Sequence, residues 1–229
     1  MNNIEIFYST CTRNKYLPIL SMLSVTLLLS ALIFTYRIIE LGPFLTPGGV
    51  VPFSLTYLMA AIITETYGYK NARKIIFGNF ICIFIFSLTV SLLLKFPAPE
   101  LSADSDAYML IFNQAIYVTV VYSLGFLFSD LINALCVSKW KGLLKGRFFC
   151  FRVIGASIIA QASFSLIVIP SLYINSVSPE RLLQQFLTTI IAKVLIILAC
   201  SYPSLIAVRL LKKMEGYTEK KPEVVFNPY

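Results

Sequence analysis

The most regular feature of the chain is an alternation between long apolar runs and short polar segments. About 20 consecutive apolar residues form a helix that crosses a bilayer, and six runs reach that length. The fourth and fifth runs are longer, which predicts that their helices tilt, kink or extend beyond the membrane. Pro170 is the expected kink or break in the fifth. The six predicted helices cover about 16–37, 48–68, 73–95, 107–137, 148–174 and 185–211.

These runs predict an all-α, polytopic membrane protein with six transmembrane helices. We expect residues 1–212 to form one transmembrane domain. Residues 213–229 are expected to form a disordered cytoplasmic tail, because opposite charges alternate along them and prolines interrupt them.

The lysines and arginines are distributed unevenly between the two ends of the predicted helices. Fifteen of them lie before the first helix, between the second and third, between the fourth and fifth, or after the sixth. Only Arg37, Lys95 and Arg181 lie in the other connections. Cations favour the cytoplasmic side, so both termini are expected to be cytoplasmic in a multi-pass protein of the inner membrane. The net charge of +8 then reflects topology and contact with anionic lipid, and nucleic acid is not an expected partner.

The composition restricts the chemistry that the chain can perform. Hydrophobic residues make up 58% of the chain and charged residues only 13%, whereas soluble domains carry roughly a quarter. Histidine is absent, and the five cysteines are scattered without a C-x-x-C pair. The commonest metal ligand and the commonest acid–base group near neutral pH are therefore missing. We expect no catalytic site, no metal site and no cofactor.

Three ionisable residues lie inside the apolar runs. Asp130 is in the fourth run, Lys193 in the sixth, and Glu65 near the cytoplasmic end of the second. A charge at the bilayer centre costs at least about 2.5–3.5 kcal/mol, so each is a candidate functional residue. The helix rise places Asp130 and Lys193 near the midplane, where they are expected to pair. Such a pair either fixes helix packing or contacts a substrate or coupling ion.

Other polar and aromatic residues extend this candidate site. Asn133 is one helical turn after Asp130 and faces the same side. Gln161 lies among small residues of the fifth run, where it either contacts a ligand or forms a hydrogen bond between helices. Tyr57 is either a packing residue or a surface on which a flat ring stacks.

The segment PFSLTYLMAAIITETYGYKNARKIIF, from Pro52 to Phe77, resembles the most distinctive stretch of a known transporter family. This is the queuosine-precursor transporter family, also called YhhQ-type or vitamin-uptake-transporter-like. The similarity extends over about residues 45–212. The residues that match the family's pattern are Leu55, Thr56, Tyr57, Leu58, Glu65, Gly68, Ala72 and Arg73, then Asp130, then Arg152, Gly155 and Gln161, and finally Lys193 and Pro203.

Three positions depart from that pattern. Ala61, Leu127 and Phe164 stand where the family carries an aspartate, a glutamine and a second aspartate. Three polar positions have thus become apolar, which makes this chain a divergent member and leaves its exact ligand open.

The resemblance implies uptake of a small base, either queuine or another 7-deazaguanine. Asp130 would read the edge of the base, Lys193 would balance its charge, and Gln161 would complete its orientation. Tyr57 or Phe164 would form an apolar wall.

The remaining assignments concern the rest of the site and the route through the membrane. Asn133 would join the substrate-binding residues beside Asp130. Glu65 contacts substrate or, with Arg73, forms an inner gate.

Other classes of protein fit the pattern less completely. A substrate-binding subunit of an energy-coupling-factor vitamin importer is also often six-helical, and it would need partner ATPases. A non-transporting assembly protein would use Asp130 and Lys193 only for packing, and an intramembrane enzyme lacks suitable groups. The energy source and a homo-oligomeric state stay open.

Overall fold

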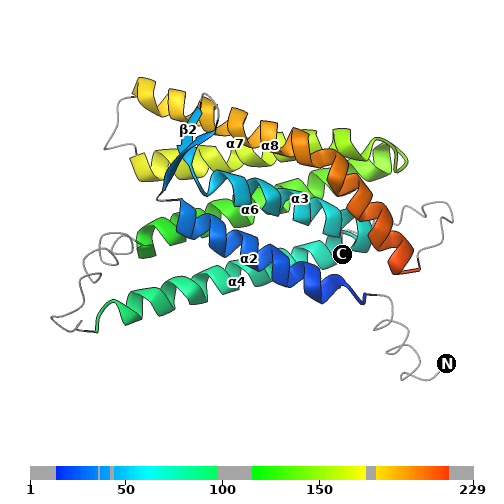
Figure 1. Ribbon diagram of the computed structural model, residues 1–229, viewed down its shortest axis with the longest axis horizontal. Coiled ribbons are helices and arrows are strands. Elements are labelled where there is room, and N and C mark those ends of the chain that lie inside the picture. The colour runs from blue at the N-terminus through cyan, green and yellow to red at the C-terminus, as the bar shows by residue number, and fades with distance from the viewer. Residues whose placement is uncertain (1–13, 36, 42–43, 97–114, 174–178, 217–229) are drawn as a thin grey trace.

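The computed structural model describes residues 14–35, 37–41, 44–96, 115–173 and 179–216. Within them, six helices are long and apolar enough to cross a membrane, which confirms the predicted all-α fold class. Figure 1 shows the helices lying along a common direction. The elements are α2 (Leu17–Phe34), β1 (Ile38–Leu41), β2 (Phe44–Pro47), α3 (Val50–Tyr67), α4 (Tyr69–Leu93), α6 (Ala115–Leu143), α7 (Phe149–Tyr173) and α8 (Pro179–Met214).

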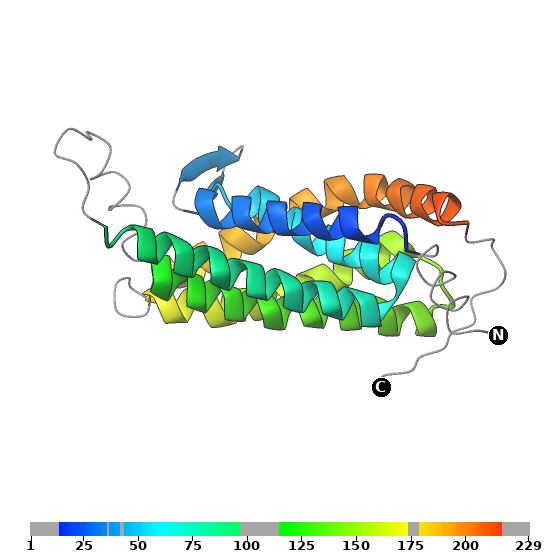
Figure 2. The same ribbon diagram turned by 90° about the horizontal axis from the view of Figure 1, so that it is seen from below.

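Helix α3 is the central element of the bundle. Of the residues in its apolar window 78% are buried, against 22% in α2, α4 and α8. It packs against the other five helices, and Figure 2 shows it between the pair α2 and α8 and the pair α4 and α6. Small residues such as Ser54, Ala60, Ala61 and Thr64 keep its surface narrow, which lets neighbouring helices approach closely.

The outer helices present apolar side chains to the surroundings. Phe84 and Leu88 on α4 and Leu195 on α8 are each about half exposed. In a bilayer these side chains face lipid, while the helices satisfy their own backbone hydrogen bonds.

The order of the outer helices separates α6 from α8. Helix α6 packs on α4 and α7, and α8 packs on α7 and α3. Both α3 and α7 therefore lie between α6 and α8, which decides which buried charges can meet.

The turn between α3 and α4 consists of a single glycine. Gly68 has φ of 83°, and its N–H donates to the Thr64 carbonyl and ends α3. Only glycine adopts this left-handed conformation without strain. The chain therefore reverses between Tyr67 and Tyr69, which is why an apolar run gives way abruptly to cations at this point.

The first and last spanning helices meet at one end of the bundle. The carboxylate of Glu215, just after α8, accepts hydrogen bonds from the backbone N–H groups of Tyr16 at 2.9 Å and Lys15 at 3.3 Å. The Tyr67 hydroxyl donates to the same carboxylate at 2.7 Å. Glu215 thus caps the start of α2 and holds it against α3 and α8. We call this the basic end, because Lys141, Arg152 and Lys212 lie there.

The opposite end carries a short β-hairpin that the sequence did not predict. Strands β1 and β2 pair antiparallel, with Ile38 opposite Pro47 and Leu41 opposite Phe44. Each strand has only four residues, too few for an alternating pattern to be recognised. We call this the hairpin end.

Several predicted boundaries differ from the structure. Of the kink or break expected at Pro170, the break is not found, because α7 continues through it to Tyr173. Helix α6 ends at Leu143, beyond the predicted 137, and α8 begins at Pro179, before the predicted 185. Membrane helices tolerate proline and polar ends, since neighbouring groups satisfy the freed backbone. The start predicted at 107 and the tail from 217 onward lie outside the described residues.

Candidate functional site

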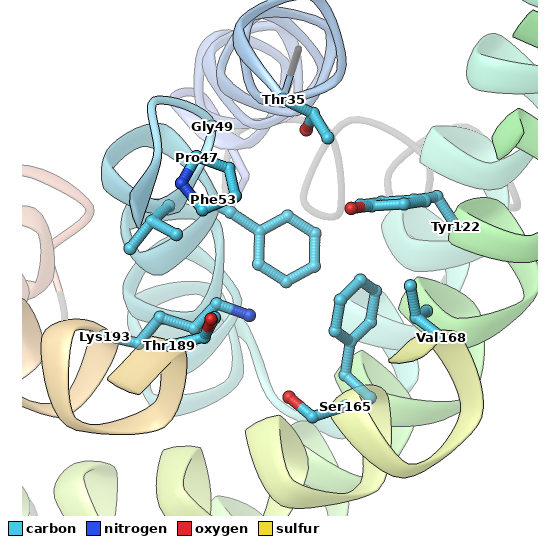
Figure 3. A pocket seen from close by; sticks show the side chains of 11 residues that line it. Thr35, Pro47, Gly49, Phe53, Tyr122, Ser165, Val168, Thr189 and Lys193 are labelled. Carbon is cyan, nitrogen blue, oxygen red and sulfur yellow. The ribbon is translucent and has the colours of Figure 1, made fainter. Parts of the chain in front are cut away.

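A pocket opens near the hairpin end, between the end of α2, the hairpin and helices α3, α6, α7 and α8. The space not filled by atoms is about 530 Å³, the open mouth included. Figure 3 shows side chains from all these elements converging on it. The lining residues are Thr35, Pro47, Gly49, Val50, Phe53, Tyr122, Phe164, Ser165, Val168, Thr189 and Lys193.

Lys193 places a buried cation in this pocket. The residue is 4% exposed, and its ammonium lies 4.8 Å from the ring centroid of Phe53 and 4.7 Å from that of Phe164. No carboxylate or carbonyl among the described residues accepts a hydrogen bond or an ion pair from it. The faces of two phenyl rings therefore provide its only strong protein contact in this part of the chain.

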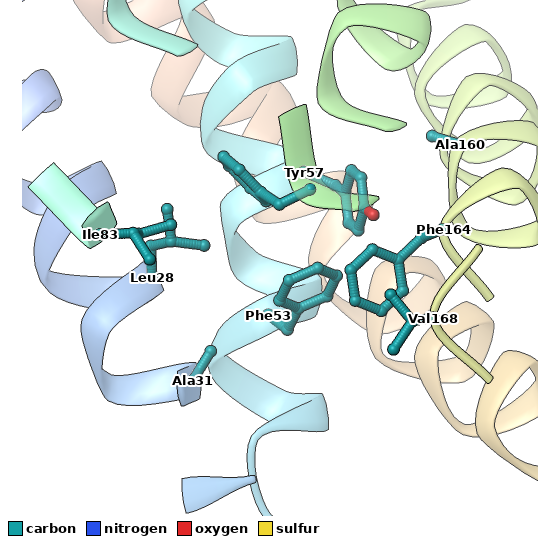
Figure 4. Close-up of a cluster of buried hydrophobic side chains, with 9 residues drawn as sticks. Leu28, Ala31, Phe53, Tyr57, Ile83, Ala160, Phe164 and Val168 are labelled. Carbon is teal, nitrogen blue, oxygen red and sulfur yellow. The ribbon is translucent and has the colours of Figure 1, made fainter. Parts of the chain in front are cut away.

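Phe53 and Phe164 line the pocket, and the Phe53 ring also contacts the rings of Tyr57 and Phe126; we call these four residues the aromatic layer. The ring centroids of Phe53 and Phe164 are 4.6 Å apart, those of Phe53 and Tyr57 5.3 Å, and those of Phe53 and Phe126 5.9 Å. All four residues are buried, and Figure 4 shows Phe53, Tyr57 and Phe164 meeting between α3 and α7. The layer closes the pocket toward the middle of the bundle.

Four buried polar residues, here called the polar cluster, lie one to two helical turns further toward the basic end on the adjacent helices α6 and α7. It comprises Asp130 and Asn133 on α6 and Ser157 and Gln161 on α7, all at most 1% exposed. Five of their atoms have no hydrogen-bond partner among the described residues: Asp130 Oδ1, Asn133 Oδ1, Ser157 Oγ and both amide atoms of Gln161. Buried polar groups are normally paired. These atoms are therefore available to hydrogen-bond water or a ligand.

Tyr57 connects the polar cluster to the aromatic layer. Its hydroxyl and that of Ser129 are hydrogen-bonded at 2.8 Å, and its carbonyl accepts a hydrogen bond from Asn133 Nδ2 at 3.0 Å. These bonds fix the ring and leave Asn133 Oδ1 for another partner. The tyrosine therefore separates the cluster from the pocket and orients one of its members.

An ion cluster closes the basic end. The Glu65 carboxylate lies 3.0 Å from Arg152 Nη1, 3.3 Å from Lys141 Nζ and 3.2 Å from Lys212 Nζ. Arg152 is fully buried and also donates to the carbonyls of Arg147 and Val137. One carboxylate on α3 thus holds cations from α6, α7 and α8. Because the charges are mutually paired, the cluster ties four helices together.

One expected pairing is not formed, and the two residues of the expected inner gate, Glu65 and Arg73, form no ion pair with each other. Asp130 and Lys193 share no ion pair, because α3 and α7 separate their helices and Tyr57 and Phe53 stand between their layers. Arg73 is exposed on α4, and the cations on Glu65 come from other helices. Gly68 starts α4 in a new direction, so neighbours in sequence here are not neighbours in the site.

The structure adds residues that the sequence did not single out. Phe53 lines the pocket, and Ser157 joins the polar cluster. Lys141 and Lys212 had been considered only as topology determinants. Arg152 matches the family pattern, but the sequence assigns it no function. Its position as a cation just inside the start of an apolar run is a signal that could have marked it as a candidate site residue.

Metal binding has no evident site in the described part of the chain. No group of three or more His, Cys, Asp or Glu side chains lies together there. The polar cluster contains one carboxylate with amides and a hydroxyl, which suits hydrogen bonding to an organic ligand.

Six helices long and apolar enough to cross a membrane, with a pocket between them and buried polar groups, are the features of a multi-pass membrane protein that can hold a small molecule. The chain belongs to the family described as "Putative vitamin uptake transporter", whose model matches residues 47–208. The match runs from the end of β2 into α8 and includes the aromatic layer, the polar cluster and most of the ion cluster. No curated protein and no solved structure gave a significant match.

Proposed function

We propose that this protein imports a heterocyclic queuosine precursor, queuine or another 7-deazaguanine, across the inner membrane. The observation that supports the proposal is the polar cluster, in which one carboxylate oxygen of Asp130 and both amide atoms of Gln161 are buried without a hydrogen-bond partner among the described residues. A ligand that offers both donors and acceptors in one plane would satisfy them together.

The chemistry of a 7-deazaguanine suits these groups. Its edge offers two adjacent N–H donors, which the Asp130 carboxylate would accept as it accepts an arginine fork. Its carbonyl oxygen would accept a hydrogen bond from the Gln161 amide, and Asn133 Oδ1 would accept a further N–H. The Tyr57 ring would form one wall.

The positions that depart from the family pattern change the protein groups that can contact the transported molecule. Ala61 is fully buried and Phe164 is 5% exposed in the aromatic layer. An apolar residue at each position removes a hydrogen-bonding group and leaves apolar contact in its place. We infer that this chain recognises its ligand with fewer polar contacts and more ring contact.

The charge distribution supports a direction for the pathway. Exposed cations gather at the basic end, which the positive-inside rule places in the cytoplasm. The pocket would then face the outside while the ion cluster closes the inside. This is the arrangement expected of an importer that is ready to receive its ligand.

Complementation tests the function. A strain that cannot synthesise queuosine would express the chain, receive each candidate base, and be scored for queuosine in its tRNA. We expect modified tRNA with at least one 7-deazaguanine, and its absence with all of them at normal membrane levels would overturn the proposal.

Reconstitution tests whether the chain works alone. We expect the purified chain in proteoliposomes to accumulate that base without partner proteins. Uptake that requires added ATPases would instead identify a substrate-binding subunit of an energy-coupling-factor importer.

A further inference from the structure

The pocket at the hairpin end is a different compartment from the polar cluster, and the aromatic layer lies between them. We propose that this pocket is an outer binding site, which holds a flat heterocycle through a carbonyl oxygen bound to the Lys193 ammonium. We further propose that the Phe53–Phe164 ring pair is the gate between this site and the polar cluster. The direction of passage rests on the proposed function, whereas the site and the gate rest on geometry alone.

The first argument is the state of Lys193. A nine-tenths buried ammonium requires compensation for its lost hydration, and here the described residues supply only the two phenyl faces. A charge-assisted hydrogen bond to a carbonyl oxygen is stronger than contact with a ring face. Figure 3 shows the ammonium pointing into the pocket, where such an oxygen would reach it without any movement of α8.

The second argument is the composition of the pocket wall. Phe53, Phe164 and Tyr122 provide ring surfaces, and Ser165 and Thr189 add hydroxyl groups beside the ammonium. Thr189 is one helical turn before Lys193, so both side chains lie on the same face of α8. A mainly apolar wall with a few convergent polar groups is typical of sites for small organic molecules.

The third argument concerns the gate. With their centroids 4.6 Å apart, the rings of Phe53 and Phe164 touch, and no flat molecule passes between them. Gly125 sets the position of the Phe164 ring, because a Cβ there would lie 3.2 Å from the ring and 2.7 Å from Val168. Because the two rings are in contact, the Phe164 side chain must turn away from Phe53 before a ligand can move from the pocket to the polar cluster.

Cysteine accessibility tests both parts of the proposal. In a full-length variant whose five native cysteines are replaced, single cysteines are introduced as Thr189→Cys in the pocket and Ser157→Cys in the polar cluster. Each protein is placed in nanodiscs and treated with a charged methanethiosulfonate reagent, which reaches both faces. We expect rapid labelling at position 189 and slow labelling at position 157, because the aromatic layer and the ion cluster close both routes.

Ligand protection tests the role of Lys193. Free 7-deazaguanine is expected to slow labelling at position 189, and Lys193→Met should raise the concentration needed by about tenfold or more. Lys193→Arg keeps donors and charge and should retain protection. The outer site would be overturned if the base protected position 189 equally well with Lys193 and with Lys193→Met. It would also be overturned if the base gave no protection of position 189 when Lys193 is present.

Substitution at the ring pair tests the gate. Phe164→Ala should accelerate labelling at position 157, and Phe164→Leu, which preserves the fold more closely, should do so to a smaller extent. Labelling at position 157 that is as rapid as at 189 before substitution would disprove the gate. Uptake is measured separately in proteoliposomes, so failure of import and failure of the outer site give different results.

Discussion

At the scale of single residues, the three ionisable groups that the sequence singles out have three different environments. Glu65 is surrounded by cations, Asp130 lies among unpaired amide and hydroxyl groups, and Lys193 lies on aromatic faces. Only Glu65 has its charge balanced within the described protein. The other two are therefore the groups whose environment an arriving ligand changes most.

Asp130→Asn is expected to abolish most uptake while leaving membrane levels normal. Asparagine has nearly the same shape, but it is neutral and offers only one acceptor oxygen, so it cannot accept hydrogen bonds from two adjacent N–H donors as a carboxylate does. The kcat/KM of uptake should therefore fall at least about tenfold. Uptake of labelled base into vesicles measures the effect. Glu180→Gln, which alters an exposed carboxylate at the hairpin end, is the matched control. Wild-type uptake by Asp130→Asn would remove this residue from the site.

Glu65→Gln is expected to destabilise the protein. The change leaves Arg152, Lys141 and Lys212 without their anion, and breaking a buried ion pair costs about 3 kcal/mol or more. Thermal unfolding in detergent measures the loss. Arg73→Gln, at an exposed cation on α4, should leave the midpoint unchanged. If Arg73→Gln lowered the midpoint as much as Glu65→Gln, Arg73 would share in the ion cluster.

At the scale of elements, α3 positions the site because it is narrow and central. Its small residues allow α6, α7 and α8 to approach, and its large ones, Phe53 and Tyr57, fill the layer between the pocket and the polar cluster. The same helix carries Glu65 near its end. A single helix thus contributes to the gate, the polar cluster and the ion cluster.

The start of α3 provides a test of this close packing. A Cβ on Gly49 would lie 2.3 Å from the Ala31 carbonyl oxygen and 2.7 Å from Thr35 Oγ1, so Gly49→Ala forces α2 and α3 apart. We expect a loss of about 1–3 kcal/mol. Gly78→Ala on α4 meets no atom within 4 Å and should be neutral or slightly stabilising. The thermal unfolding midpoints of the Gly49→Ala and Gly78→Ala variants are compared in nanodiscs. Equal midpoints would argue against the close approach of α2 and α3.

At the scale of the whole molecule, the layers form a sequence along the bundle axis. The pocket comes first from the hairpin end, followed by the aromatic layer, the polar cluster and the ion cluster. In the proposed import, this arrangement would be the state that is open toward the hairpin end. Opening of the basic end would then require that Glu65 part from cations on three other helices.

The orientation of the whole molecule is testable with two exposed lysines. Lys95 lies beyond α4 at the hairpin end, and Lys145 lies between α6 and α7 at the basic end. In a background without native cysteines, an impermeant thiol reagent on intact cells should label Lys95→Cys and not Lys145→Cys, because cations remain cytoplasmic. Disruption of the cells should expose both. The reverse pattern would place the pocket inside and contradict import through it.

The number and approximate positions of the helices could be predicted from the sequence, because crossing a membrane requires a long apolar stretch for each helix. A bilayer core requires about 20 apolar residues and internally satisfied backbone, so the number of helices follows from counting. The helix breaks were less readable, since α7 passes through Pro170 and two four-residue strands leave no periodic pattern. The candidate site residues stand out in the sequence for a related reason, because a charge or amide in an apolar run is costly, and their role in binding stays a prediction.

The sequence by itself therefore determined the membrane class, the six helices and the presence of buried Glu65, Asp130 and Lys193. Only the tertiary structure decided the partners of these residues. Helix order around α3 separates Asp130 from Lys193 and brings Arg152, Lys141 and Lys212 to Glu65. Hydropathy depends on each residue and its neighbours in sequence. The pairing of buried charges depends instead on which helix faces meet, and only the packing of the helices determines which faces those are.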